Sequence, residues 1–432
     1  MIRSELLSYE RPGRERQRVQ LVRWDDWASL RFLRPGVGAD ALRETAQIYR
    51  RFLIPAAPWV FGQLLLFALP EGGEAELRAA AETLRRGLRL RGGEPRFSDK
   101  KTRALWETLS RAGCVELVRG RLPFLRVLPV RSSTGLLSES EPDARLRVNA
   151  SFFIFDPFDC ATRYDTVGTP FGLAVEDGEV LSPPLCGREA LFVYRDGRVR
   201  VETPTLEDLT VRIGDKAFRP GRDGAVYARP GYRKTPRGRG FDHVIVGRTL
   251  VDVVRGGGCP VPASGFVLRL AEQTGEPGGA VAYGGMEGLF FGVQAGNSLV
   301  RGGAPTEGFV SRFWNVREPW RTPFPPSLYP LDYEKARAAR IALGADAAGK
   351  PLLLWAEGAA KIGHRPGEDS CGASLSEFAA ICRDVGMVEG VNLDGGGSAQ
   401  ILLDGKRALQ ISDRRDDGSE QERAVPLGLM VK

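Results

Sequence analysis

The segment VNLDGGGSAQILLDGK, residues 391–406, combines a carboxylate, three glycines and a hydroxyl between two apolar runs. Gly395–Gly397 carry no Cβ, so the backbone there can adopt positive φ or approach a ligand closely. Consecutive N–H groups in such a turn can converge on an anion, and phosphate suits this arrangement. Asp394 would stand at the rim of the turn and Ser398 would add a donor. We therefore expect an anion-binding turn with a fixed acid beside it.

A second interpretation of the same residues stays open. The turn differs from the lysine-containing phosphate loops of nucleotide-binding proteins, because no lysine follows the glycines and the next segment is predicted to be a strand. A loose hairpin turn, in which Asp394 bonds its own backbone, would explain the glycines equally well. Spacing alone does not separate these two interpretations.

The composition limits the other kinds of chemistry. The chain has 432 residues, a net charge of +7 and only two histidines, His243 and His364. A multi-histidine metal site or a histidine-centred triad therefore has almost no residues to draw on, and we expect acid–base chemistry to depend on carboxylates. The six cysteines contain no C-x-x-C pair, which argues against a zinc ribbon. We expect no cofactor, although Asp394 with amide carbonyls could hold Ca²⁺ or Mg²⁺.

Several segments share one family resemblance. VNLDGGGSA resembles the signature of the phosphodiester glycosidase family, and VNASFF at 148–153, QAGNSLVRGG at 294–303 and RIALG at 340–344 resemble other segments in that family's order. The resemblance covers roughly residues 145–432. Ala150 and Ser151 replace two glycines of the family pattern and Ile341 replaces a threonine, so the fit to substrate is expected to differ.

The resemblance implies hydrolysis of the bond between a sugar's anomeric carbon and a phosphodiester oxygen. Phosphate is a good leaving group, so one carboxylate could suffice where ordinary glycosidases use two. On this basis Asp394 would act as nucleophile or as base for water. Arg340 and the amides of Gly395–Gly397 would neutralise the departing phosphate.

The remaining site residues have less specific roles. Asn149 and Asn392 would hold sugar hydroxyls or orient Asp394. Three residues are candidates for a second carboxylate, and the sequence does not choose among them: Asp156, Glu287 and Glu357.

The chain predicts an α+β fold of mixed, mainly antiparallel sheets with packed helices. Residues 1–140 are expected to form a mostly helical accessory region, because 75–90 and 99–113 have apolar residues at helical spacing. Residues 141–432 would form the catalytic domain, with Asp177-Gly178 and Asp196-Gly197 as hairpin turns. Ser374 and Glu377 have the spacing of a capping box, which predicts a helix over 374–386.

The uncharged run at residues 52–70 approaches the length of a membrane span, but its prolines favour a buried helix over an anchor. The polar N-terminus favours a cytoplasmic protein, with export or anchoring as the alternative.

Two other functions stay open. The chain could bind sugar phosphates without cutting them, or bind nucleic acid through its arginine-rich N-terminal region. The sequence favours a glycosyl phosphate as the partner over nucleic acid or a membrane, and it does not indicate the oligomeric state.

Overall fold

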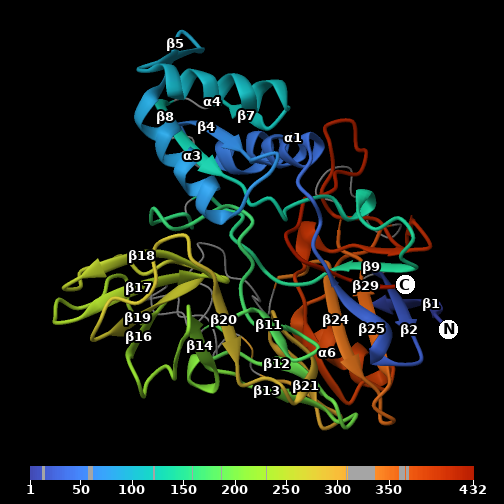
Figure 1. Cartoon of the computed structure of the whole chain (residues 1–432). Coiled ribbons are helices and arrows are strands. Elements are labelled where there is room, and N and C mark those ends of the chain that lie inside the picture. Colours follow the sequence, from blue (N-terminus) through green and yellow to red (C-terminus); the bar gives the residue numbers. More distant parts are fainter. Residues whose placement is uncertain are drawn as a thin grey trace.

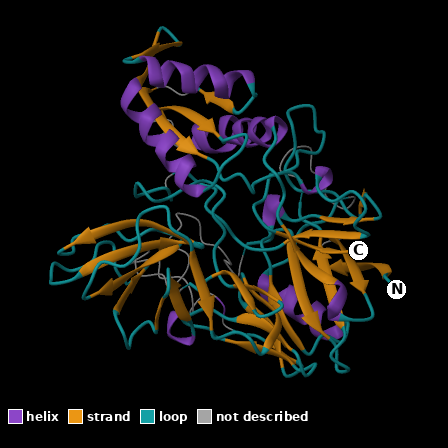
Figure 2. Cartoon of the chain, in the orientation of Figure 1, coloured by secondary structure: helices purple, strands orange, loops and turns teal. Residues whose placement is uncertain are grey.

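The chain forms an upper lobe that contains most of the helices and two lower groups of sheets (Figure 1). The computed structural model describes residues 1–11, 15–56, 62–119, 122–157, 159–185, 187–229, 231–307, 309, 336–359, 365 and 369–432. Strands predominate over helices in these residues (Figure 2). The named strand pairs are antiparallel with one exception, β4 with β8, so the prediction of mainly antiparallel sheets is confirmed.

A seven-stranded sheet lies at the centre of the C-terminal half, and its strands come from both ends of the sequence. Its order is β1 (Arg3–Arg11), β2 (Glu15–Arg23), β25 (Pro351–Ala356), β24 (Arg340–Ala345), β26 (Glu389–Asn392), β22 (Ser298–Arg301) and β23 (Ala304–Pro305). The strands β24 and β25 are buried on both faces, which explains their nearly continuous apolar sequences.

Helix α6 (Leu375–Asp384) covers one face of this sheet, where Phe378 packs among residues that include Leu354. Ser374 accepts a hydrogen bond from the Glu377 amide, and the Glu377 carboxylate accepts one from the Ser374 amide. The predicted capping box and helix are confirmed.

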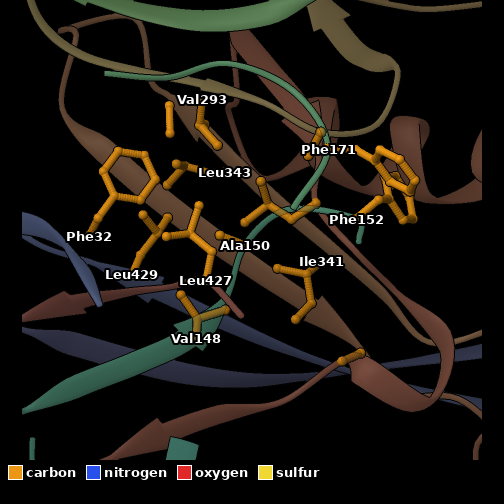
Figure 3. Close-up of a cluster of buried hydrophobic side chains, with 14 of the residues drawn as sticks. Phe32, Val148, Ala150, Phe152, Phe171, Val293, Ile341, Leu343, Leu427 and Leu429 are labelled. Carbon is orange, nitrogen blue, oxygen red and sulfur yellow. The ribbon is translucent and has the colours of Figure 1, made fainter. Parts of the chain in front are cut away.

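A five-stranded sheet covers the other face. Its order is β28 (Lys406–Arg407), β27 (Ile401–Leu403), β9 (Leu146–Asn149), β29 (Gly428–Val431) and β3 (Leu30–Leu33). Figure 3 shows Val148 and Leu429 of this sheet in the same buried cluster as Ile341 and Leu343 of β24. This apolar layer supports the ends of β9 and β26, from which the candidate site is built.

Three further sheets fill the middle of the chain. The first contains β11 (Glu179–Ser182), β10 (Ala174–Glu176), β21 (Leu289–Gln294), β12 (Ala190–Tyr194) and β13 (Val199–Glu202). The second contains β15 (Lys216–Phe218), β14 (Thr210–Ile213) and β20 (Val281–Gly284). The third contains β16 (Ala225–Ala228), β19 (Gly265–Leu270), β17 (Phe241–Val246) and β18 (Thr249–Arg255). The predicted hairpins at Asp177-Gly178 and Asp196-Gly197 join β10 to β11 and β12 to β13.

The upper lobe mixes helices with short strands. Its helices are α1 (Ala39–Ile48), a π-helix (Tyr49–Leu53), α2 (Ile54–Ala56), α3 (Glu74–Gly87) and α4 (Lys100–Arg111). Its strands are β7 (Val115–Val118), β4 (Gly62–Phe67), β8 (Leu122–Pro129) and the hairpin β5 (Leu88–Arg91) with β6 (Glu94–Phe97). The two helices predicted at 75–90 and 99–113 are present as α3 and α4.

The prediction of a mostly helical N-terminal region is wrong, because residues 1–140 also contain strands β1 to β8. Val19 and Leu21 of β2 become buried through the pairing of β2 with β25. This pairing crosses the predicted boundary at residue 140. A partner more than 300 residues away in the sequence leaves no local signal, so helical spacing elsewhere dominated the prediction.

The apolar run at 52–70 is not a single helix. The π-helix and α2 take up its first residues, and Gly62–Phe67 form β4, which lies between β7 and β8. Pro58 and Trp59 lie outside the described residues. Among those described, no helix combines the length and the apolar composition that crossing a membrane requires.

A buried ion pair between Arg18 and Glu357 links β2 to the end of β25. Arg18 donates from Nε and Nη2 to both carboxylate oxygens of Glu357, at 2.6 and 2.8 Å, and the Glu357 side chain is 2% exposed. Arg18→Ala would leave a buried charge without its cation and should lower the free energy of unfolding by about 3 kcal/mol. Chemical denaturation measures this loss. The matched control is Arg16→Ala, an exposed residue of the same strand, and an equal loss in both variants would contradict the prediction.

Candidate active site

Asp394 lies where the end of β26 meets the end of β9. The Asp394 amide donates to the Ala150 carbonyl at 2.9 Å. The Asn149 side chain then spans the turn: its Nδ2 donates to the Asp394 carbonyl at 2.7 Å, and its Oδ1 accepts from the Gln400 amide at 3.0 Å. The structure therefore brings Asn149 and Asp394 together, and Asn149 fixes both ends of the glycine turn.

Gly395 and Gly397 have no room for a Cβ, whereas Gly396 is favoured by its backbone conformation. A Cβ on Gly395 would come within 2.6 Å of the Ala339 carbonyl oxygen, and a Cβ on Gly397 would overlap Asp413 Oδ2 and Arg423 Nη2. Gly396 has φ +58°, and nothing lies within 4 Å of the place where a Cβ would be. Glycine is favoured here because it adopts positive φ without steric cost. The Gly396 amide donates to the Ala339 carbonyl at 2.8 Å, which leaves fewer amides for an anion than the sequence suggested.

The Asp394 carboxyl is held out of water. Its residue is 8% exposed, and burial raises the pKa of Asp394 to about 7. Hydrogen bonds from the Ser398 hydroxyl and the Gly395 amide, together with the charge of Arg423, lower the pKa and offset only part of this effect. Near neutral pH both protonation states of Asp394 are populated, which suits a general acid or base.

Arg423 and Asp413 border the turn, and sequence reasoning missed both. Arg423 donates from Nε and Nη2 to Asp413 Oδ2, at 3.1 and 2.7 Å, and Asp413 is fully buried. The Arg423 guanidinium carbon lies 4.6 Å from the centre of the Phe155 ring. Arg423 Nη1 donates to no described residue. The "ERAVPLGL" context gave no signal for this role, because the pairing depends on how the loop that carries both residues folds back on itself, with the Gln421 amide donating to the Asp413 carbonyl at 3.0 Å.

The upper lobe reaches this arginine through Phe155. The buried Tyr49 hydroxyl donates to the Phe155 carbonyl, and the two rings meet edge to face with centroids 5.2 Å apart. Tyr49 begins the π-helix, a rare element that often marks functional sites. Arg51 of the same turn donates to the Arg414 carbonyl, in the loop that carries Asp413 and Arg423.

Arg340 is placed next to the turn, with its Cα 3.8 Å from where a Cβ on Gly395 would lie. Its guanidinium is buried and donates to the carbonyls of Ala336 and Ala373, at 2.7 and 3.1 Å. Burial lowers the pKa of Arg340 to about 10. Arg340 therefore holds backbone segments around the site, and Arg423 is the cation whose charge acts on Asp394.

Asn392 ends β26 two residues before Asp394 and is buried. Its amide donates to the Asn297 carbonyl at 2.8 Å, and its carbonyl accepts from the Gly296 amide at 2.6 Å. Asn297 also accepts a hydrogen bond from Arg188, a fully buried arginine that the sequence analysis did not single out. The segments QAGNSLVRGG and VNLDGGGSA are thus adjacent in the structure.

The three candidates for a second carboxylate differ in their surroundings. Glu357 binds Arg18 and Ser370 and accepts from the Gln410 amide, which is the pattern of a structural ion pair. Glu287 is exposed and accepts from the Gly285 amide, and this bond lowers the pKa of Glu287. Asp156 is buried and follows Phe155, whose ring lies beside Arg423.

Buried polar atoms in the segments around the turn that make no hydrogen bond within the described structure include Ser151 Oγ, Asn297 Nδ2, Gln400 Oε1 and Ser412 Oγ. Buried polar groups normally have partners, so these atoms are available to a polar ligand. The described residues contain no group of three metal-ligating side chains. His243 is buried and hydrogen-bonded within its sheet, and His364 lies outside the described residues.

The family model described as phosphodiester glycosidase matches residues 267–432. The family resemblance is therefore confirmed over this part of the chain, which contains Arg340, Asp394 and Arg423. Asn149 belongs to the earlier part, outside the matched range. The match supports a glycosidase-type hydrolase.

Among solved structures, a hypothetical protein from Synechocystis is 15% identical with a TM-score of 0.47; the comparison covers 100% of this chain and 62% of that one. The catalytic domain of zebrafish N-acetylglucosamine-1-phosphodiester alpha-N-acetylglucosaminidase, auto-inhibited by its pro-peptide, is 11% identical with a TM-score of 0.43. This comparison covers 100% of this chain and 82% of the zebrafish chain. A protein from Burkholderia pseudomallei that is described as exported is 18% identical with a TM-score of 0.42. This comparison covers 100% of this chain and 97% of the Burkholderia chain. No curated protein matches the sequence.

The packing around the glycines predicts unequal effects of substitution. Gly397→Ala should lower the free energy of unfolding by about 2 kcal/mol, because its Cβ would displace the Asp413–Arg423 pair. Gly396→Asn is the matched control, since asparagine tolerates positive φ and nothing lies within 4 Å of the added Cβ. Thermal unfolding of both variants checks this prediction, which fails if Gly396→Asn is the more damaging change.

The raised pKa of Asp394 predicts how stability depends on pH. The folded protein keeps a proton up to about pH 7, whereas the unfolded chain loses it near pH 4. The stability that this proton provides is present below pH 4 and is lost as pH rises through 7. The free energy of unfolding of Asp394→Asn should therefore exceed that of the parent at pH 8 by on the order of 3 kcal/mol. This difference should shrink towards pH 5.

Urea unfolding at several pH values measures this difference, with the exposed Asp143→Asn as the control. A gain that is independent of pH would show that Asp394 is ionised throughout.

Proposed function

We propose that the chain hydrolyses sugar-1-phosphodiesters between the anomeric carbon and the phosphate oxygen. One observation carries the proposal. The glycine turn holds a buried carboxyl group, that of Asp394, whose pKa is about 7 and on which the charge of Arg423 acts. The family match, which includes this turn, supports the same class of reaction.

Asp394 is suited to the acid–base part of the reaction. In its ionised form it takes a proton from water as the oxygen of that water bonds to the anomeric carbon, or it attacks that carbon itself. In either route the bond from the carbon to the phosphate oxygen breaks, and its electron pair leaves with the phosphate monoester. After direct attack the sugar is bonded to Asp394, and a water molecule then attacks the anomeric carbon, loses a proton to solvent and releases the sugar together with the ionised carboxylate. The low exposure of Asp394 strengthens its interaction with positive charge developing on the sugar ring.

Arg423 is the group best placed to receive the departing phosphate. Its Nε and Nη2 are held by Asp413, so the guanidinium is fixed while Nη1 stays available for a phosphate oxygen. A fixed guanidinium loses little freedom when it binds phosphate. Gly395 and Gly396 are half-buried, so the turn has a side that a ligand can reach. Asn149 and Arg340 act in this proposal by positioning the turn.

Turnover assays on a panel of sugar-1-phosphodiesters, nucleotide sugars included, test the proposal. Asp394→Asn should lower kcat at least a hundredfold, and Arg423→Lys should lower kcat/KM more for phosphodiesters than for aryl glycosides. The parent's kcat should rise with pH and level off above about 7, because the ionised carboxylate is the active form. Asp143→Asn, an exposed carboxylate, is the control.

Three outcomes would count against the proposal. Saturable binding of these substrates without released sugar would indicate a binding protein. Equal turnover by Asp394→Asn and the parent would remove Asp394 from the reaction. A kcat that falls as pH rises through 7 would mean that the protonated acid is the active form. NMR of the first sugar product separates direct attack, which retains the anomeric configuration, from activation of water, which inverts it.

A further inference from the structure

A second polar cavity lies where the upper lobe, the β17–β18 turn and the C-terminal sheet meet. Its volume is about 310 Å³, within the range of small-molecule sites. Glu74 of α3, Arg131 of the connection after β8, Arg248 of the β17–β18 turn and Leu427 just before β29 all line it. Elements distant in sequence therefore contribute to one cavity.

Arg131 extends across this cavity. Its guanidinium approaches the β17–β18 turn, with Nη1 3.6 Å from where a Cβ on Gly247 would lie. The nearest carboxylate oxygen in the described structure is Glu74 Oε2, 4.0 Å from Arg131 Nε. The other oxygen of Glu74 already accepts from Arg78 at 2.7 Å and from Thr166 at 3.1 Å. Glu74 is thus mainly bound to Arg78, and the Arg131 charge is only weakly balanced.

Arg34 and Arg248 complete the positive lining. No described carboxylate lies within 4.0 Å of Arg34, and Arg248 forms an ion pair with Glu179. Three arginines and one carboxylate, Glu74, line the cavity. Glu179, outside the lining, offsets part of this excess of two positive charges, and the remaining positive charge favours a phosphate monoester, which is an anion at neutral pH.

A neighbouring acidic pocket shares Arg34 with this cavity, and its carboxylates could oppose an anion. Three of them already have basic partners within 4.0 Å: Glu141 with Lys432, Glu176 with Arg31 and Glu179 with Arg248. The fourth, Asp177, is exposed, so solvent and salt screen its charge. The acidic pocket therefore does not cancel the excess of arginines.

The neutral lining also suits an oxyanion. Ser132, Ser133, Ser182 and Thr249, whose side chains carry hydroxyl groups, also line the cavity. Hydroxyls and guanidinium groups together supply the short, charge-assisted hydrogen bonds that phosphate oxygens accept. Pro426 and Leu427 form an apolar part of the wall, which lowers the local dielectric and strengthens those bonds.

We propose that this cavity binds the dianionic phosphate group of a small phosphate monoester. The inference is independent of the proposed reaction, since the cavity shares no residue with the turn at 394–398. The two sites are nevertheless connected. The Leu427 carbonyl accepts from the Ala150 amide at 3.0 Å, and the Ala150 carbonyl accepts from the Asp394 amide at 2.9 Å. A ligand at the cavity is thus two backbone hydrogen bonds from Asp394.

Calorimetric titration of the full chain with glycerol 2-phosphate, inorganic phosphate and dimethyl phosphate, at constant ionic strength, tests this proposal. The monoester and inorganic phosphate should bind more tightly than the monoanionic diester. Arg131→Ala and Arg34→Ala should each weaken monoester binding at least tenfold, the loss of one charge-assisted hydrogen bond. Arg91→Ala, an exposed arginine on the β5–β6 hairpin, is the matched control.

Asp394→Asn and Arg423→Lys separate this site from the proposed active site, and both should leave the monoester affinity of the cavity unchanged. Arg131→Lys, which keeps the charge, should retain part of the binding, and phosphate should raise the Tm of the parent but not of Arg131→Ala. The proposal is overturned if the parent binds no monoester at millimolar concentration. It is also overturned if Arg131→Ala binds like the parent, or if only Arg423→Lys loses binding.

Discussion

A carboxylate kept out of water at the meeting point of two sheets is the constraint on which the rest of the molecule depends. Burying Asp394 costs free energy, and that cost is borne because the turn is fixed from several sides. Asn149 spans its two ends, the Ala339 carbonyl lies against Gly395, and the Asp413–Arg423 pair lies against Gly397. The same burial raises the pKa of Asp394 to about 7. The chemistry proposed for the site is therefore a direct consequence of its packing.

The N-terminal third is part of this arrangement and not simply an addition to it. Strand β2 continues the central sheet and brings Arg18 to the buried Glu357. The upper lobe contributes Tyr49, which holds Phe155 under the guanidinium of Arg423. A disturbance in the upper lobe can therefore reach the charge next to Asp394. The cavity lined by Arg34, Arg131 and Arg248 lies on a second boundary of the same lobe.

The arginines show how environment assigns roles to identical side chains. Arg340 and Arg423 both lie near the turn, yet the Arg340 guanidinium is used by the carbonyls of Ala336 and Ala373. Arg423 is bound along one edge only and faces Asp394 with its charge. Arg18 has a third role, because it neutralises a carboxylate that resembled a catalytic candidate. Residue type alone predicted a phosphate-binding role for Arg340, whereas the contacts show that carbonyl groups already bind its guanidinium.

The sequence by itself determined the elements with local signals. The capping box at Ser374, the hairpins at Asp177-Gly178 and Asp196-Gly197, and the bare turn after Asp394 follow from short-range sterics and hydrogen bonds, which a few neighbouring residues specify. The strands at residues 3–11 and 15–23, the strand at 62–67 and the Asp413–Arg423 pair were decided only by the tertiary structure. Strand β2 pairs with β25 and β4 with β8, both distant in the chain, and the Asp413–Arg423 pair packs against Gly397 of the glycine turn. Pairing over such separations is set by the burial of whole surfaces, and no local pattern encodes it.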